Sequence, residues 1–241
     1  MEFNQIVDKI CIIILAAGKG SRMKSNCAKC ACIIDGKPMI AHIVDTFISL
    51  NIKDIITVVG YQKEDIINIL GNKVKYAVQE KQLGTANAVM AAKNLVKENK
   101  ICVIVPGDMP FISKEIIKSL ISKYVSSNSF LTFITTEMDK ELHYGRVIQK
   151  DNYYKIKEFK DLNEDEKAIK DLNAGIYAIK SDILFNSLKD INNKNKQNEY
   201  YLTDIVEKVS KKYKTTVLKI KNCKEITGIN DIETLKELEK I

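Results

Sequence analysis

A glycine-rich segment after the first apolar run has the composition of a phosphate-binding turn. Ile10–Leu15 leads directly into Ala16-Ala17-Gly18-Lys19-Gly20-Ser21-Arg22. Small residues let backbone N–H groups approach phosphates closely, and Arg22 and the later Lys29 supply fixed positive charge for phosphate oxygens. The spacing matches neither G-x-G-x-x-G nor G-x-x-x-x-G-K-[ST], so taken alone the segment is equally compatible with a structural turn.

Two other strand ends carry polar residues suited to a nucleotide. Asp108 follows an apolar run in Pro106-Gly107-Asp108, and a carboxylate there is a natural Mg²⁺ ligand, because Mg²⁺ leaves most of its octahedron to phosphates and water. Gln79 and Gln82 precede Gly84-Thr85, and an amide that both donates and accepts suits the edge of uracil. Thr85 either caps the following helix or lies near an anion at the helix N-terminus, and these roles are compatible.

Strands and helices alternate through the first half of the chain. Strands are predicted at Ile10–Leu15, Asp54–Gly60, Val74–Val78, Ile101–Val105 and Phe130–Thr135, with helices at about 39–50, 63–70, 85–97 and 113–126. This alternation favours right-handed βαβ units, and the nearly continuous apolar strands favour coverage on both faces. We therefore predict an α/β fold: a Rossmann-like, mostly parallel mixed sheet with helices on both faces.

The second half has a different pattern, typical of a mixed extension of the same sheet. The segment 144–159 reads as a hairpin turning around 150–152, and 171–180 as a strand followed by a helix from Ser181. Residues 192–197 read as a loop, 201–211 as a helix, 215–220 as a strand, and the chain from Ile232 as a charged helix. We expect one domain over 1–241, with a nucleotide-binding part to about 135 and a substrate-facing part from about 136.

The composition and the N-terminal sequence exclude several classes of protein. The apolar fraction of 45% and charged fraction of 29% are those of a globular protein, and the apolar run at 10–17 is too short for a membrane span of roughly 20 residues. The N-terminus lacks a basic head and a cleavage site, so no secretory signal is expected. The net charge of +7 is spread along the chain, except for a lysine-rich run from Lys208 to Lys224, and this pattern favours a solvated surface over a nucleic-acid interface. We thus expect small-molecule partners, no nucleic acid, no membrane and a cytoplasmic location, and the sequence leaves the oligomeric state open.

Six cysteines raise the question of a metal cluster. Cys27, Cys30 and Cys32 form C-x₂-C-x-C, but a closed zinc site needs four ligands, no second cysteine pair exists, and the only histidines are His42 and His143. Thiols in a reducing compartment are the favoured interpretation, and the role of this trio stays open.

The motifs together resemble one enzyme family. LAAGKGSRM with Lys29, then DGKPMI, VQEKQLGTANAV, PGDMP, YGRVI, KEFKD, NAGIYAI, NEYYLTD and TGIND occur in the order found in sugar-1-phosphate nucleotidyltransferases, over residues 10 to about 235. The glycine loop is shared with guanylyl- and cytidylyltransferases. The later motifs are specific to the uridylyltransferase half of the bacterial bifunctional N-acetylglucosamine-1-phosphate enzymes, the UDP-N-acetylglucosamine pyrophosphorylases.

The resemblance implies a set of site residues. It implies that Arg22 and Lys29 are catalytic, and that Mg²⁺ is the cofactor, held by Asp108 and Asn230. Asp231 is either an alternative ligand or the N-cap of the terminal helix. The implied substrate-binding residues are Leu15, Ala16, Ala17, Gly18, Lys29, Gln79, Gly84, Thr85, Pro106, Gly107, Asp108, Gly145, Glu158, Asn173 and Asn230. Tyr200, Tyr201 and Thr203 are expected to shape the sugar pocket rather than take part in chemistry.

The implied reaction is attack of the sugar-1-phosphate on the α-phosphorus of UTP, with release of pyrophosphate. The nucleophile is ionised at pH 7, since the second pKa of a phosphate monoester is about 6, so no general base is required. Two alternatives remain: a related enzyme using another sugar- or alcohol-phosphate or another nucleotide, and a non-catalytic nucleotide-sugar-binding regulator.

The chain departs from the family pattern in four places and in length. Ala28 precedes the lysine where the family has proline, and Cys30-Ala31-Cys32 follows it where the family has Val-Leu-His. Pro106 stands where tyrosine is common, and Asn87 replaces a histidine. No hexapeptide repeat follows, so we expect no β-helix and no acetyltransferase domain in this chain.

Overall fold

The computed structural model describes residues 3–20, 27–137, 143–221, 224–231 and 234. Its main sheet has the strand order β11-β7-β10-β6-β1-β4-β5, and β8 and β9 extend it beside β10. The strands are β1 (Ile10–Leu15), β4 (Ile55–Val59), β5 (Lys75–Val78), β6 (Ile101–Pro106), β7 (Leu131–Glu137), β8 (Arg146–Gln149), β9 (Tyr154–Lys157), β10 (Asp171–Lys180) and β11 (Thr215–Lys221). A separate two-stranded ribbon, β2 (Ile33–Ile34) with β3 (Lys37–Pro38), was not predicted from the sequence.

Parallel pairing joins β1, β4, β5 and β6. β1 pairs in parallel with β4 and β6, β4 with β5, and β11 with β7, while β10 runs antiparallel to both β6 and β7. The predicted mostly parallel mixed sheet is confirmed, as is the hairpin, since β8 and β9 pair in antiparallel fashion.

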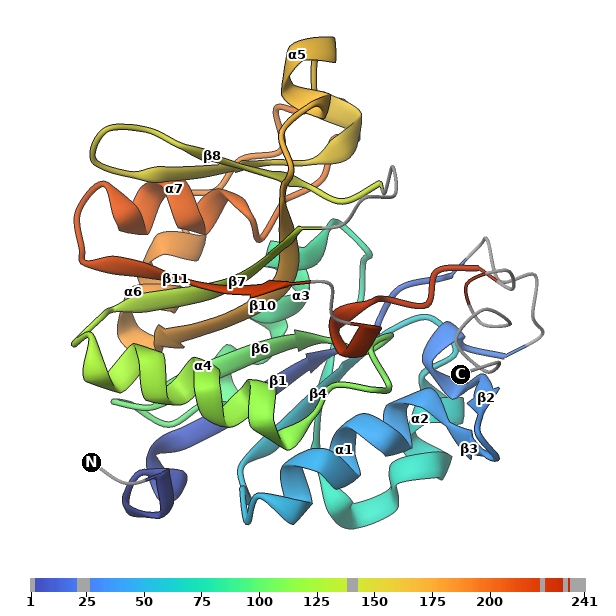
Figure 1. Ribbon diagram of the computed structural model, residues 1–241. Coiled ribbons are helices and arrows are strands. Elements are labelled where there is room, and N and C mark those ends of the chain that lie inside the picture. Colours follow the sequence, from blue (N-terminus) through green and yellow to red (C-terminus); the bar gives the residue numbers. More distant parts are fainter. Residues whose placement is uncertain (1–2, 21–26, 138–142, 222–223, 232–233, 235–241) are drawn as a thin grey trace.

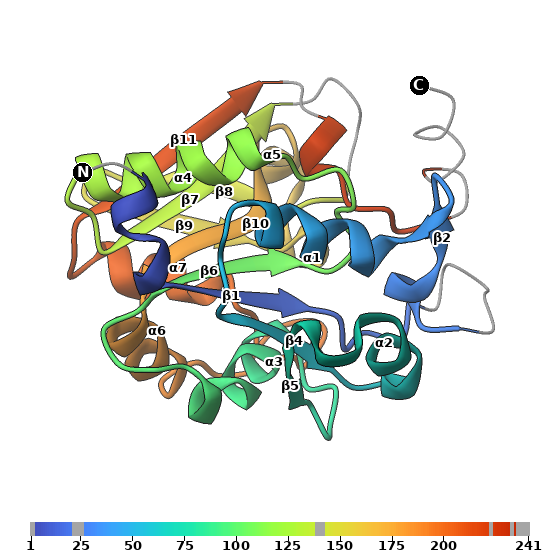
Figure 2. The same cartoon turned by 90° about the horizontal axis from the view of Figure 1, so that it is seen from below.

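Helices cover both faces of the sheet, as predicted (Figure 1). The helices are α1 (Met39–Ser49), α2 (Lys63–Leu70), α3 (Thr85–Ala91), α4 (Lys114–Ser126), α5 (Glu164–Lys167), α6 (Ser181–Leu188) and α7 (Asp204–Ser210). Figure 2, looking from below, shows α1 and α4 on one side of the strands and α3 and α6 on the other. None of these described helices is long and apolar enough to cross a bilayer.

The alternation of side chains along β1 divides the core in two. Ile10, Ile12 and Ile14 pack with residues of α1, α2 and α4, whereas Cys11 and Ile13 pack with residues of α3, α6 and α7. All five side chains are fully buried. Because successive strand residues face opposite ways, a strand covered on both faces must be apolar throughout, which explains the unbroken run in the sequence.

Two predicted helices are longer in the sequence pattern than in the structure. The predicted helix 85–97 ends at Ala91 and continues as a short 3₁₀ turn at Lys93–Leu95, and the predicted helix 201–211 starts only at Asp204. The charged helix predicted from Ile232 lies almost wholly outside the described residues; only Thr234 is helical among them.

Candidate active site

Two adjoining cavities lie where β1, β5 and β6 end. The larger has a volume of about 660 Å³ and the smaller about 440 Å³. Pro106, Asp108, Glu158, Asn173 and Gly175 line both, so the cavities form one continuous cleft. The carboxyl edge of parallel strands is the usual ligand site of an open α/β sheet.

Most of the residues expected at the site lie along this cleft. The larger cavity is lined by Leu15, Ala17, Gly18, Lys29, Gln79, Gly84 and Thr85, the smaller by Gly145 and Asn230, and both by Pro106, Asp108, Glu158 and Asn173. Ala16 and Gly107 are not among the lining residues: Ala16 is buried, and Gly107 donates its N–H to the Leu15 carbonyl (2.8 Å), joining the ends of β1 and β6. Arg22 lies outside the described residues.

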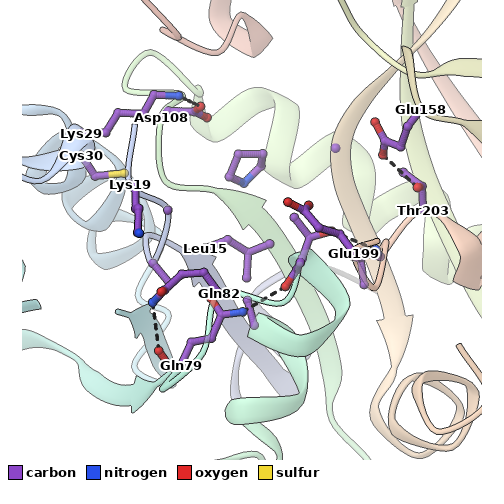
Figure 3. Close-up of a pocket in the computed structure, with 18 of the residues that line it drawn as sticks. Leu15, Lys19, Lys29, Cys30, Gln79, Gln82, Asp108, Glu158, Glu199 and Thr203 are labelled. Atoms are coloured by element: carbon purple, nitrogen blue, oxygen red, sulfur yellow. Dashed lines mark hydrogen bonds and ion pairs between the residues drawn. The ribbon is translucent and has the colours of Figure 1, made fainter. Parts of the chain in front are cut away.

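Lys29 joins two residues that are distant in sequence. Its Nζ donates to an Asp108 carboxylate oxygen and, at 2.7 Å, to Oδ1 of Asn230 (Figure 3 shows the Lys29–Asp108 pair). The Lys29 and Asp108 side chains are only 12% and 19% exposed. Two oxygen atoms on separate loops therefore converge on a single cationic group.

This convergence provides a test of whether a metal ion fits. An amide oxygen and a carboxylate that reach the same ammonium nitrogen are also spaced to reach one hard cation, and Mg²⁺ is bound by few protein oxygens of this type. The donor set thus fits a divalent cation. No cluster of three or more Cys, His, Asp or Glu suited to a metal is found in the described part of the chain, and this site offers one carboxylate and one amide.

The loop that carries Asn230 is held in place by hydrogen bonds from two of its main-chain N–H groups. Ile229 donates its N–H to the Asp108 carbonyl (2.8 Å), and Gly228 donates its N–H to the Tyr144 hydroxyl (2.9 Å). The Asp231 carboxylate accepts from the N–H of Thr234 (2.7 Å), the contact expected of an N-cap. Tyr144 was not singled out from the sequence, although it stands in the quoted YGRVI motif.

The loop before Lys29 is anchored by a bond that depends on one of the chain's departures. The Ala28 N–H donates to Oδ2 of Asp65 on α2 (2.8 Å). A proline at this position has no N–H and could not make this bond. Lys29 then begins a short 3₁₀ turn, Lys29–Ala31, so the alanine still leads into an ordered segment.

Gln79 forms part of the cleft wall and is almost fully buried, at 5% exposed. Its Nε2 donates to the Gly84 carbonyl (3.0 Å) and to Oδ1 of Asn87 (2.8 Å). Gly84 has φ +114°, and a Cβ there would lie 2.5 Å from the Tyr200 carbonyl oxygen, so this position requires glycine.

Thr85 does not cap α3, which is a correction to one of its two expected roles. Gly84 is the N-cap residue, Thr85 is the first helical residue, and its Oγ1 accepts from the Leu202 N–H (2.9 Å). The hydroxyl thus links the start of α3 to the segment before α7.

The other end of the cleft has a hydrogen-bonded carboxylate. Glu158 Oε1 accepts from the Thr203 hydroxyl (2.9 Å), a contact visible in Figure 3. Burial raises the pKa of Glu158, neighbouring Asp204, Asp161 and Glu199 raise it further, and the Thr203 bond lowers it. Thr203 therefore influences the charge of Glu158, beyond the shaping role expected for it.

Asn173 is fixed by two bonds at a bulge in β10. Its Nδ2 donates to the Tyr177 hydroxyl (2.9 Å), and its Oδ1 accepts from the Gly175 N–H (3.1 Å). The register of β10 against β7 shifts between Asn173 and Tyr177. Tyr177 is buried yet lines the cleft, and sequence analysis missed it because a tyrosine in an apolar strand reads as core.

The cysteine trio lies beside the site. The Sγ atoms of Cys27 and Cys32 are 3.9 Å apart, and Cys30 is buried against the glycine turn before Asp108. Burial raises the pKa of Cys30 to about 12, which keeps it a neutral thiol at physiological pH. All three are free of disulfide bonds.

Comparison with known proteins gives consistent results. The family model described as nucleotidyl transferase matches residues 11–229. The chain is 40% identical over 233 residues to the bifunctional protein GlmU of Geobacillus sp. (strain WCH70), covering 95% of this chain and 51% of that protein. Against GlmU of Bacillus licheniformis it is 35% identical over 237 residues, covering 97% and 52%. The chain thus spans about half the length of these curated relatives, and the resemblance drawn from the motifs is confirmed.

Solved structures support the same fold. A putative glucose-1-phosphate thymidylyltransferase from Bacillus anthracis, in complex with sucrose, superposes with a TM-score of 0.76 at 20% identity, covering 96% of this chain and 94% of that one. A UDP-glucose pyrophosphorylase complexed with UDP-glucose gives 0.73 at 19% identity, with 97% of both chains covered. The fold predicted from the sequence is therefore confirmed.

Proposed function

The chain belongs to the nucleotidyl transferase family, and from this premise we propose that it converts UTP and N-acetylglucosamine-1-phosphate to UDP-N-acetylglucosamine and pyrophosphate. The observation that carries the proposal is the meeting of Lys29, Asp108 and Asn230 in one cleft, across 79 and 201 residues of sequence. A protein that only bound a nucleotide sugar would not need this group, because its chemistry suits a phosphate chain with a departing pyrophosphate.

The nucleotide occupies the larger cavity in this proposal. Gln79 faces the base, and Leu15, Ala17 and Gly18 lie under the nucleoside and its phosphates. Lys29 and Arg22 neutralise phosphate oxygens. The volume of about 660 Å³ lies within the range of cavities that hold a molecule of nucleotide size.

Mg²⁺ is the proposed cofactor, held by Asp108 and Asn230. When bound it supplies positive charge that stabilises the phosphate oxygens and the leaving pyrophosphate. Lys29 bonds to the same two oxygens in the structure, so its ammonium must move from them toward the phosphates when substrate and cation are present.

The sugar phosphate occupies the other end of the cleft. Glu158 accepts from sugar hydroxyls, and Asn173, whose amide is already fixed by Tyr177 and Gly175, offers its remaining amide proton. Gly145 allows close approach of the sugar: a Cβ there would lie 3.2 Å from the Lys157 carbonyl oxygen and 3.6 Å from Oε2 of Glu158.

The chain's part in the reaction is positioning and charge stabilisation. An oxygen of the sugar phosphate forms a bond to the α-phosphorus of UTP, the bond from that phosphorus to the bridging oxygen breaks, and pyrophosphate leaves with the electron pair. The attacking oxygen is already ionised at pH 7, so no residue has to remove a proton. The rate enhancement comes from holding the two anions in line and from neutralising the charge of the leaving pyrophosphate.

Release of pyrophosphate tests the proposal. The protein should be assayed with UTP, CTP and GTP, each combined with N-acetylglucosamine-1-phosphate, glucose-1-phosphate and an alcohol phosphate, in Mg²⁺. We expect turnover chiefly with UTP and N-acetylglucosamine-1-phosphate, and its loss in Asp108→Ala. Turnover with another pair only would reassign the substrates, and tight UDP-sugar binding without any turnover would make the protein a regulator.

The proposed location is the cytoplasm, where UTP and sugar phosphates are available, and the proposed partners are these small molecules alone. Support comes from the cysteines of the described residues, which are thiols and not disulfides, as expected in a reducing compartment.

A further inference from the structure

The hydrogen bonds of Gln79 allow only one orientation of its side-chain amide. The Gly84 carbonyl can only accept a hydrogen bond, so the group that lies 3.0 Å from it must be the NH₂ of Gln79. The second hydrogen of that NH₂ is taken by Oδ1 of Asn87 at 2.8 Å. Both donor positions of Gln79 are therefore used inside the protein, and only its Oε1 remains for a ligand.

Asn87 accepts one of these two hydrogen bonds from outside the cleft. It lies on α3, one turn after Gly84, is half-buried, and is not among the residues that line either cavity. It can influence a nucleotide only through Gln79, which does line the larger cavity.

We propose that Asn87 is a specificity-determining residue, which holds Gln79 with its oxygen toward the base and so makes the site select uracil over cytosine. The inference rests on the proposed function in taking the larger cavity as the nucleotide site. It concerns a position where the sequence departs from the family pattern, and it gives that departure a physical role.

The selection follows from the hydrogen-bonding edges of the two bases. Uracil presents an N3–H donor, which pairs with the Gln79 oxygen. A cytosine in the same place presents the N3 lone pair, so two acceptors face each other in a nearly water-free position. Sites that would leave a buried polar group unpaired reject the wrong ligand strongly. If the side-chain amide of Gln79 rotated by 180°, its NH₂ would face the base and donate to N3 of cytosine. The hydrogen bond to Asn87 opposes that rotation.

The expected effect of removing Asn87 is moderate, because the Gly84 carbonyl still favours the same orientation. One hydrogen bond of this kind has a net value that corresponds to about a 3- to 10-fold change in an equilibrium. In Asn87→Leu, which keeps the size of the side chain and removes the acceptor, we expect the ratio of UTP to CTP affinity to fall by about that factor, with weaker UTP and stronger CTP binding.

Asn87→Asp is the matched control, because a carboxylate still accepts from Nε2 of Gln79. Dissociation constants for UTP and for CTP with Mg²⁺ are measured by titration calorimetry on the full chain, together with kcat/KM for each nucleotide. We expect the aspartate variant to keep the UTP preference of the unmodified protein, since any general effect of its charge cancels in the ratio. Asn87→Ala gives the same comparison without a bulky side chain, and circular dichroism checks that each variant is folded.

Two results would overturn the inference: an unchanged UTP to CTP ratio in both acceptor-free variants, or an equal loss of preference in Asn87→Asp and Asn87→Leu. Failure of the proposed function has a different signature, since the unmodified protein would then show no UTP preference or no turnover at all. Binding of UTP without turnover would remove the proposed enzyme activity and still leave the calorimetric comparison decisive for Asn87.

Discussion

Replacing Lys29 with methionine should change two measured quantities in opposite directions. In the structure the Lys29 ammonium occupies the position between Asp108 and Asn230 where we propose a divalent cation. Without nucleotide, the lysine competes with the metal for the same oxygens. With nucleotide, its charge serves the phosphates. Lys29→Met should therefore bind a divalent cation more tightly in the absence of nucleotide and turn over substrate more slowly.

The size of each effect follows from the contacts. Charge-assisted hydrogen bonds contribute about 1.5–3 kcal/mol, and part of this is recovered when the displaced ammonium finds water, so a net value of about 1.4 kcal/mol, or about tenfold in metal affinity, is expected. Loss of a cation that stabilises developing charge on the leaving group should lower kcat by about 10²- to 10³-fold.

Binding of Mn²⁺, followed by the loss of its free EPR signal, measures the first quantity without any reaction. Lys19→Met is the matched control, because Lys19 also lines the larger cavity yet points to a different part of it from Lys29 (Figure 3). Removing a positive charge from the cavity raises Mn²⁺ affinity slightly in both variants, and only Lys29→Met also removes a direct competitor for the two oxygens. Equal Mn²⁺ affinity in the two variants, or weaker binding in Lys29→Met, would refute this reasoning.

Three further outcomes are expected. Gly84→Ala should lower the free energy of unfolding by about 2–3 kcal/mol and the Tm by about 5–10 °C, because alanine is strained at φ +114° and its Cβ would meet Tyr200. The control is Gly18→Ala, which has nothing within 4 Å of its added Cβ and should keep the Tm of the unmodified protein in a calorimetric scan. Glu158 has a pKa raised above its usual value of 4.5 in the folded protein, so its contribution to the free energy of unfolding is present at low pH and is lost as pH rises through the folded-state pKa. Glu158→Gln should therefore gain Tm relative to the unmodified protein as pH rises above 4.5 in a pH series, while KM for the sugar phosphate rises. A parallel pH dependence of the two Tm values would contradict this. Tyr144→Phe leaves the Gly228 N–H without its acceptor, and at about 1 kcal/mol this should weaken Mn²⁺ binding about fivefold without loss of fold, whereas unchanged Mn²⁺ affinity would show that the bond does not position Asn230.

Hydrophobic patterning was sufficient for the elements that are buried on a regular face. β1 runs from Ile10 to Leu15 and α2 from Lys63 to Leu70, both as predicted, because their apolar positions are set by the sheet and helix periods. The short ribbon of β2 and β3 was missed, since two-residue strands carry too few side chains to show a period.

The predicted helix boundaries are wrong where tertiary contacts determine where a helix begins or ends. The segment before Asp204 has a helical pattern, yet the Leu202 N–H is bonded to Thr85 Oγ1, which takes it out of the helix. In the segment after Ala91, Leu95 and Val96 donate to Ala92 and Lys93 in i→i−3 bonds, so the chain tightens into a 3₁₀ turn while its apolar spacing still reads as helical.

The site was only partly within reach of sequence reasoning. The rule that ligands bind at the carboxyl ends of strands brings Leu15 and Pro106 together, and these two residues are indeed paired neighbours on β1 and β6. Nothing in the spacing relates Lys29 to Asn230, and that pairing came from the resemblance. The bond from Thr203 to Glu158 and the bond from Gln79 to Asn87 were not predicted, because a side chain's partner across two elements has no signature in a single sequence.

Exchange of labelled pyrophosphate tests the central claim most directly. The protein is incubated with UDP-N-acetylglucosamine, Mg²⁺ and ³²P-pyrophosphate, and the label in UTP is measured over time for the unmodified chain and for Asp108→Ala. The proposed in-line reaction predicts labelled UTP only when the nucleotide sugar and the divalent cation are both present, and none above background in Asp108→Ala. Absence of label with the unmodified protein, or equal labelling in the variant, would contradict the account.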